Sequence, residues 1–319
     1  MEKEDIAATL CILLVIVLGV YMLVSVSETS DASYYDNTPI ESRVNVTNAA
    51  PFVTQVNLYK QSDEEDTSID LDEGTTTTLV CNATVNDLNG WSDIVSVNAT
   101  IYDADSYSLT SPNDNNYHYF QGSCTNSSVN ISAREFSCTF DVWYYANNAT
   151  WNCSVSAIDI ENATGSSMDL SPPTITALAA LNLSTNLIDF GEMPPGNTTD
   201  DAHEQNVDVT NTGNVNINLS VDGYGAVDGD GLAMNCTQGN ITISYLRYNI
   251  TANQDFDVSM WNLTDDKLSS GIPKLVISQR VDDGDNGKVN STNSTYWKLR
   301  IPKGVKGFCN GTVTFSAVV

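Results

Sequence analysis

The sequence predicts an all-β protein in which two tandem β-sandwiches follow one N-terminal hydrophobic helix. Three observations predict this arrangement. Residues 6–26 carry no charge, and a helix needs about 20 apolar residues to cross a bilayer. Beyond them, apolar and polar residues alternate at the period of two that strands require, and no stretch keeps a helical period. Clusters of Gly, Asn, Asp and Pro separate these stretches, as turns between strands do.

The apolar segment gives residues 1–27 the character of a membrane anchor or a signal sequence. A secretory apolar core has about 7 to 15 residues, so we expect this longer segment to be retained as an anchor. Cleavage after the Ser-Val-Ser triplet at 25–27 is the alternative. A third fate is packing with copies of itself inside a pilus-like fibre, although Lys3-Glu4-Asp5 does not match the pilin cleavage signal. The charged flanks do not set the orientation, which the sequons and cysteines must decide.

The chain holds 18 Asn-X-Ser/Thr sequons, all of them beyond the apolar segment. Random placement of its 34 Asn and 64 Ser and Thr would produce about 7. The excess indicates N-glycan acceptors on the outside of the cell, although an Asn- and Thr-rich β-protein also forms sequons by accident. The acceptors are Asn45, Asn82, Asn98, Asn126, Asn130, Asn148, Asn152, Asn162, Asn182, Asn197, Asn218, Asn235, Asn240, Asn249, Asn262, Asn290, Asn293 and Asn310.

The first sandwich is predicted over residues 51–172. Three stretches, 78–85, 136–142 and 151–157, place apolar residues and cysteines on one face and Asn, Ser, Thr or Asp on the other, so the first face must be the core side. Asp87-Leu88-Asn89-Gly90 reads as a turn between neighbouring strands. With its late Trp-Asn-Cys-Ser-Val strand, this region resembles the immunoglobulin-like modules common in archaeal surface proteins. The resemblance implies a fold and an extracellular setting, and no activity.

The second sandwich is predicted over residues 173–319, because Ser-Pro-Pro at 171–173 interrupts the strands. Its motifs are Asp-Phe-Gly followed by Pro-Pro-Gly within 187–196, the turn Thr210-Asn211-Thr212-Gly213-Asn214, and a terminal strand at 311–317. We attribute the turn to the positive φ that Asn and Gly accept. This order of motifs resembles sandwich domains of archaeal surface glycoproteins, and it is similar to the camelysin-like subunits of bacterial biofilm fibres.

Seven cysteines divide in a way that favours disulfides. Cys11 lies in the apolar segment, where a thiol is a small apolar residue. Even numbers remain in each predicted sandwich, and their spacings do not suit zinc. Four cysteines permit three pairings, of which the inward positions favour one across the core and one within a hairpin. The expected pairs are Cys81–Cys153, Cys124–Cys138 and Cys236–Cys309.

Residues 28–50 belong to neither sandwich and form an extended linker or a donor strand. Ile40, Ser42, Val44 and Val46 alternate with polar residues, as in a strand with one apolar face. Such a strand could complete the sheet of a neighbouring copy. The alternatives are a first strand of its own domain or a stalk.

The chain offers little that could carry catalysis. His118 and His203 lie in polar surroundings without a motif, so we interpret both as surface histidines. Catalytic and nucleotide-binding signatures are absent from the sequence, and no cofactor is expected. Oxygen-rich Asp/Gly turns make calcium the better candidate, although neither turn has EF-hand spacing. The weak calcium candidates are Asp228, Asp230, Asp282, Asp283 and Asp285.

The balance of 13 basic against 40 acidic residues gives a net charge of −27, which excludes nucleic acid as a partner. We therefore expect a structural, N-glycosylated cell-surface protein that is not an enzyme. Its expected form is a subunit of an extracellular filament, with copies of itself as partners and the membrane as a second partner if 6–26 is retained. A monomeric adhesin or solute receptor is the alternative, and a secreted hydrolase is the third.

Overall fold

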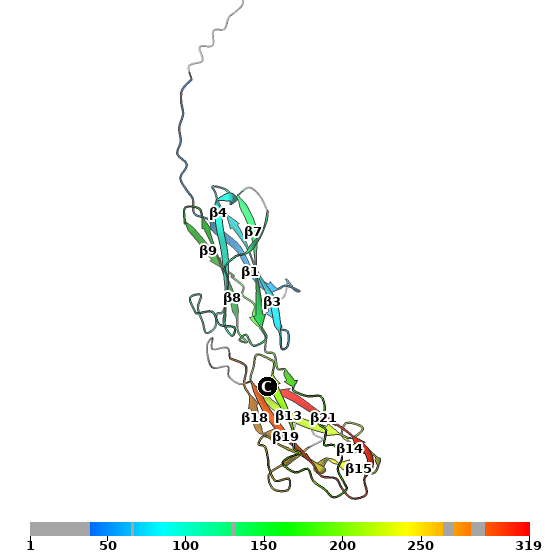
Figure 1. Ribbon diagram of the computed structural model, residues 1–319. Helices are drawn as coiled ribbons and strands as arrows, with labels where there is room; N and C mark the ends of the chain where they lie inside the picture. The colour runs from blue at the N-terminus through cyan, green and yellow to red at the C-terminus, as the bar shows by residue number, and fades with distance from the viewer. Residues whose placement is uncertain (1–38, 65–66, 129–131, 264–270, 282–290) are drawn as a thin grey trace, which may run out of the picture. The chain divides into compact units, whose positions relative to one another are not determined.

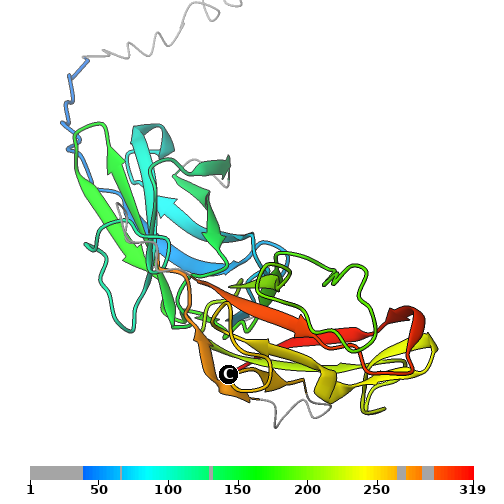
Figure 2. The same ribbon diagram turned by 60° about the horizontal axis from the view of Figure 1, so that its bottom comes forward.

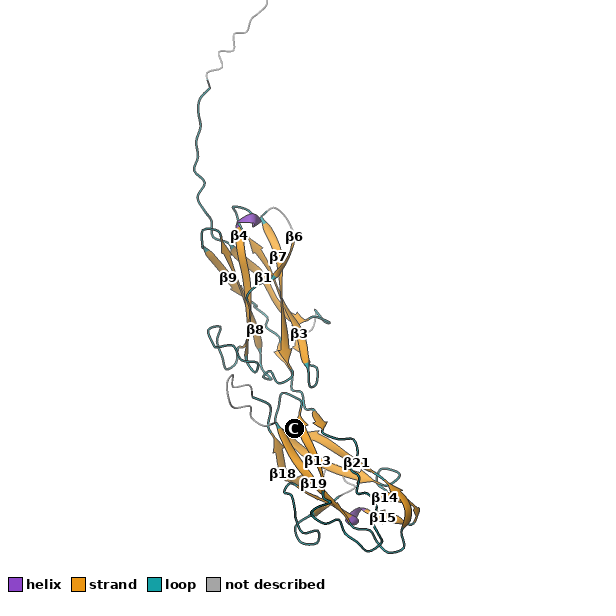
Figure 3. Ribbon diagram, viewed as in Figure 1, coloured by secondary structure: helices purple, strands orange, loops and turns teal. Residues whose placement is uncertain are grey.

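The computed structural model describes residues 39–64, 67–128, 132–263, 271–281 and 291–319, and these residues form an all-β structure. They build several antiparallel sheets, with two short 3₁₀ turns, Trp91–Asp93 and Ile243–Tyr245, as the helical elements of the described ranges (Figure 3). None of their helices is long and apolar enough to span a membrane. The predicted N-terminal helix, with segment 6–26 and Cys11, lies outside the described residues.

Two four-stranded sheets build the first half of the structure (Figure 1). One sheet has the order β1 (Phe52–Lys60), β3 (Thr76–Asn86), β7 (Ala133–Trp143) and β6 (Thr125–Ser128). The other has the order β5 (His118–Gln121), β4 (Ile94–Asp103), β8 (Trp151–Asp159) and β9 (Thr164–Met168). A parallel pair adds β2 (Ser68–Ile69) and β10 (Thr174–Ile175).

The core of this first sandwich-like body contains the residues that the alternation predicts. The inward positions of β3, β7 and β8 are all buried, and they form one cluster with β1 and β4. Trp151 is the largest fully buried side chain there, and its indole Nε1 donates a hydrogen bond to the Asn147 carbonyl at 2.9 Å. Burying such a ring is favourable because its one polar group is satisfied.

Three sheets build the second half (Figure 2). The largest has the order β11 (Leu181–Leu183), β12 (Gln205–Asn211), β19 (Thr292–Leu299), β16 (Leu246–Asn249) and β17 (Trp261–Asn262). The second has the order β18 (Gly271–Ile277), β13 (Ile217–Tyr224) and β21 (Thr312–Val318). The third has the order β15 (Asn240–Thr242), β14 (Leu232–Gln238) and β20 (Lys306–Asn310).

A second, separate hydrophobic cluster lies among these sheets and is centred on Trp297. Tyr248 and Phe315 contact the Trp297 ring, with ring centroids 5.1 Å and 5.7 Å away. Many apolar residues of this cluster are only partly buried, whereas the first cluster has few of that kind. The second core is therefore the more open of the two.

The Thr-Gly-Asn turn between β12 and β13 does not need its glycine for a positive φ, contrary to the expectation from the sequence. Gly213 does not have a positive φ, and neither do the flanking asparagines. A Cβ at position 213 would lie 2.0 Å from the Leu178 carbonyl oxygen, so the close approach of a second backbone excludes any side chain. Asn214 holds the same segment, because its Oδ1 accepts from Leu178 N at 2.6 Å and its N donates to Leu178 O at 3.0 Å.

Residues 39–47 belong to a separate unit of the structure and form no strand, although their alternation predicts one. Ile40, Val44 and Val46 are 90%, 85% and 75% exposed. The described part of this segment forms no strand in the structure. The three expectations for residues 28–50, a donor strand, a first strand of its own domain and a stalk, stay predictions.

Candidate functional site

The second half of the structure contains an apolar groove along one edge of its core. It consists of two adjoining hollows of about 250 and 710 Å³. Both are lined by Leu187, Ile188, Phe190, Met234 and Gly311. One hollow continues past Leu183, Val313 and Phe315, and the other continues past Met193, Ile301, Val305 and Phe308.

The groove exists because two sheet edges are left without a neighbouring strand. β21 pairs only with β13, and β11 pairs only with β12, among the strands that the structure describes. Every residue of β21 remains partly or fully exposed, whereas its partner β13 is largely buried. After β11 the chain continues as irregular backbone through 184–204, so its apolar residues cover the core only in part. Sheet edges of this kind present unpaired backbone groups.

The three disulfides of the structure are the pairs expected from the sequence. Cys81 of β3 and Cys153 of β8 join the two sheets of the first sandwich, with their Cα atoms 6.4 Å apart. Cys124 and Cys138 are separated by 14 residues and join the segment before β6 to β7. Cys236 and Cys309 stand directly opposite each other on β14 and β20. Three disulfides are typical of proteins from an oxidising compartment.

The glycan acceptors are mostly accessible. Of the sixteen acceptors with a described environment, eleven are exposed and four, Asn82, Asn98, Asn152 and Asn293, are half-buried. Asn130 and Asn290 lie outside the described residues. Asn249 differs from all of these, because it is only 6% exposed and its Nδ2 donates to the Ser259 carbonyl at 2.7 Å. Its Oδ1 accepts from Thr251 N at 2.9 Å, so both ends of the amide hold the local turn.

The two histidines occupy different environments, and one corrects the sequence interpretation. His118 is buried at the start of β5, not on the surface. Its ring nitrogens lie 3.0 Å from Asn113 Oδ1 and 3.2 Å from the Leu109 carbonyl oxygen, so the ring holds a loop in place. His203 is exposed, and its hydrogen bond to Asp200 lowers the pKa of that carboxyl.

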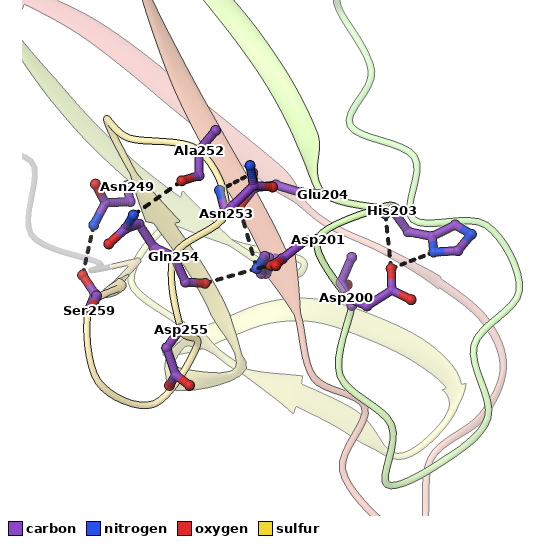
Figure 4. A network of polar contacts seen from close by, with 12 residues as sticks. Asp200, Asp201, His203, Glu204, Asn249, Ala252, Asn253, Gln254, Asp255 and Ser259 are labelled. Atoms are coloured by element: carbon purple, nitrogen blue, oxygen red, sulfur yellow. Dashed lines mark hydrogen bonds and ion pairs between the residues drawn. The ribbon is translucent and has the colours of Figure 1, made fainter.

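A network of polar contacts around Asp201, Glu204 and Gln254 in the second half was not signalled by the sequence (Figure 4). Lys298 lies in β19 between two buried neighbours, and its Nζ contacts Asp201 Oδ1 and the Gln254 carbonyl, the latter at 2.8 Å. Glu204, also buried, places Oε1 3.6 Å from the same Nζ and accepts from Asn253 N at 2.8 Å. The network therefore ties two loops to a core strand and neutralises the buried charge.

Of the weak calcium candidates, Asp228 and Asp230 lie within the described residues. Both Asp228 and Asp230 are exposed, and the carboxylate of Asp230 accepts hydrogen bonds from the backbone nitrogens of Gly225, Ala226, Val227 and Leu232. These bonds lower the pKa of the Asp230 carboxyl and favour a structural role in its own loop. Asp282, Asp283 and Asp285 lie outside the described residues.

A different group of carboxylates does come together, in the first half. Asp87, Asp93 and Asp159 place carboxylate oxygens within 4.8 Å of one another. Sequence reasoning missed this group because Asp87 reads as a turn residue and Asp159 lies on a strand far along the chain. Local spacing carries no signal for such a group, which only the packing of the two sheets brings together.

Comparisons with known proteins leave the chain without a family. No protein-family profile matches it, and no curated protein is similar to it. Solved structures that overlap it weakly include the following three. A DUF4466 family protein of Parabacteroides merdae has 9% identity and a TM-score of 0.22 over 79% of this chain and 100% of its own. An alpha-2-macroglobulin of Salmonella has 12% identity and a TM-score of 0.25 over 82% of this chain and 16% of its own. A structure of the chaperone–tip adhesin complex of CFA/I fimbriae has 8% identity and a TM-score of 0.26, over 84% and 83%. Overlaps this low define neither fold nor function.

Proposed function

We propose that this chain is a structural, N-glycosylated cell-surface protein, not an enzyme, that assembles into an extracellular filament. Both halves are then immunoglobulin-like sandwiches outside the cell, and the N-terminus lies in or across the membrane. The observation that supports this most is the hollow of the apolar groove that β21 lines with Val313 and Phe315, together with an exposed segment whose apolar residues alternate. The tail, which we define as residues 39–47, would add a strand to the second sandwich of a neighbouring copy.

The tail and the groove match in length and in chemistry. β21 has 7 residues, and the alternating part of the tail, residues 40–46, spans the same number. Ile40, Val44 and Val46 share one face of an extended chain, and the groove offers them Leu, Ile, Phe and Met side chains. Docking would cover partly exposed apolar residues and pair the free edge of β21, which are the two terms that drive strand addition.

A variant of the tail tests this proposal. We would purify the full-length chain in detergent and measure its mass by light scattering over a range of concentrations. Val44→Asp puts a charge on the apolar face of the tail and should shift the assembly to monomers. Arg43→Gln, which changes the net charge by the same amount on the opposite face, is the matched control and should assemble like the unchanged chain.

A synthetic peptide of residues 39–47 gives a second readout. It should occupy the groove and reduce the mass of the assembly, whereas a scrambled peptide should not. A full-length chain that stays monomeric at all concentrations would contradict the filament and favour a monomeric adhesin or receptor. Assembly that survives Val44→Asp would assign the contact to the hydrophobic segment 6–26 instead of the tail.

A further inference from the structure

Three carboxylates from distant parts of the chain meet at one end of the first sandwich. Asp87 follows the last residue of β3, Asp93 ends the 3₁₀ turn Trp91–Asp93, and Asp159 is the last residue of β8. Their nearest carboxylate oxygens all lie within 4.8 Å of one another. Asp87 is 0% and Asp159 1% exposed, and Asp93 is half-buried.

The negative charges of this group are not matched by a cation of the protein. No Lys or Arg in the described part of the chain forms an ion pair with any of the three. Three carboxylates this close together repel one another unless a counter-ion lies between them.

A buried oxygen of the cluster also lacks a hydrogen-bond partner among the described residues. Asp87 Oδ1 accepts from Asn89 N at 2.7 Å, but for the buried Asp87 Oδ2 the described part of the chain provides no donor. Asp159 differs, since its Oδ1 accepts from Ala163 N and its Oδ2 from Asn48 Nδ2, both at 2.7 Å. A fully buried carboxylate oxygen without a partner is costly unless a cation contacts it.

We propose that Asp87, Asp93 and Asp159 bind a calcium ion. Calcium lies about 2.3 to 2.6 Å from its oxygen ligands, so no two ligand oxygens are more than about 5 Å apart, and the three aspartates meet this limit. The ligands are all oxygens, and oxygen ligands suit hard cations such as calcium better than they suit zinc or copper. Half-exposed Asp93 leaves a side open for water, and calcium accepts the irregular coordination that results, whereas magnesium requires a near-ideal octahedron.

The ion would also fix the point where the tail leaves the first sandwich. Asn48 donates to Asp159, and Ala49 N donates to Asn89 Oδ1 at 2.7 Å, so the first residues of the sandwich are held by the loop and strand that carry the ligands. Bound calcium would hold the loop of Asp87 and Asp93 against the end of β8 and would stabilise the start of the sandwich. This inference is independent of the filament proposal, because it concerns a single copy.

Calorimetry and thermal unfolding of the full-length chain test the site. The protein is first freed of divalent cations with a chelator and then titrated with calcium chloride or magnesium chloride. Calcium should bind and raise the unfolding midpoint, and magnesium should bind more weakly. Asp93→Asn should weaken calcium binding at least tenfold, and Asp87→Asn should do the same. Asp141→Asn, an exposed carboxylate of β7 with the same charge change, is the control and should bind calcium like the unchanged chain.

The stability of the variants without calcium gives the sharpest distinction. If the three aspartates exist to hold an ion, Asp93→Asn should be at least as stable as the unchanged chain in chelator, because it relieves repulsion, and less stable in calcium. A purely structural role predicts a loss of stability in both conditions. The proposal is overturned if calcium neither binds nor raises the unfolding midpoint up to about 10 mM. This concentration is roughly ten times the weakest dissociation constants of extracellular calcium modules. Unchanged calcium affinity in both variants, or equal affinity for magnesium, would overturn it as well.

Discussion

Cys81 and Cys153 join the facing sheets of the first sandwich through fully buried positions, 72 residues apart in the chain. The bond closes most of the first sandwich into one loop. Cys124 and Cys138 close a loop of only 14 residues in the same sandwich. The two bonds should therefore contribute differently to stability, because a longer loop loses more conformational entropy in the unfolded chain when it is closed.

We predict that replacing Cys81 and Cys153 by Ala lowers the free energy of unfolding by about 4 kcal/mol, and replacing Cys124 and Cys138 lowers it by about 3 kcal/mol. Guanidinium unfolding of the two double variants, followed by tryptophan fluorescence, measures both. Each double variant replaces two cysteines, so its loss relative to the unchanged chain can be compared directly with that of the other. A greater loss from the shorter loop would contradict the entropic ordering.

The inner faces of the first sandwich could be predicted from the sequence because they follow from a local period of two. The same period places Cys81, Cys138 and Cys153 inward but leaves the choice among the three possible pairings open. Leu79, Cys81 and Val85 must share a face in any strand, whichever strand lies beside them. Burial of His118 and the approach of Leu178 to Gly213 could not be predicted, because both depend on segments brought together by tertiary packing. The aspartate cluster could not be predicted for the same reason, because strand register and sheet packing decide which strand ends meet.

The tail shows the converse limit of a local pattern. Its alternation predicts a strand, but a strand exists only where another backbone accepts its hydrogen bonds. Ile40, Val44 and Val46 are exposed and lie in no strand of the structure. The sequence identifies their shared apolar face, but a local pattern carries no information about a partner strand.

The Lys298 network should be strongly coupled. Lys298→Met is expected to lower the free energy of unfolding by about 3 kcal/mol, because it leaves the buried Glu204 without its cation. Glu204→Gln alone should cost less, since Asp201 still neutralises Lys298. The double variant should lose less free energy of unfolding than the sum of the losses of the two single variants. Urea unfolding of all four proteins measures this cycle, and strictly additive losses would show that the two charges do not interact.

Tyr248 should make stability dependent on pH in the alkaline range. Burial raises the pKa of its hydroxyl to about 12 in the folded protein, against about 10 in the unfolded chain. The folded state therefore binds the proton more tightly, and the stabilisation is complete below pH 10. It is lost as the pH rises from about 10 to 12, by up to about 1.4 kcal/mol per pH unit. Tyr248→Phe should remove this slope when unfolding is measured across that range, and an unchanged slope would assign it to another group.

Glycan occupancy should separate Asn249 from the exposed acceptors. Its amide is buried in β16 and donates to the Ser259 carbonyl at 2.7 Å, whereas Asn148 and Asn182 are exposed. Attachment of a sugar to Asn249 Nδ2 would break that hydrogen bond and place a bulky polar group where the fold has no room. Mass spectrometry of the native protein should therefore find glycans at Asn148 and Asn182 and none at Asn249.

The same contrast should appear in the free energy of unfolding of the unglycosylated protein. Asn249→Gln should lower it by about 1 kcal/mol, and Asn148→Gln should leave it nearly unchanged. Full occupancy at Asn249 would mean that this turn forms differently in the glycosylated chain.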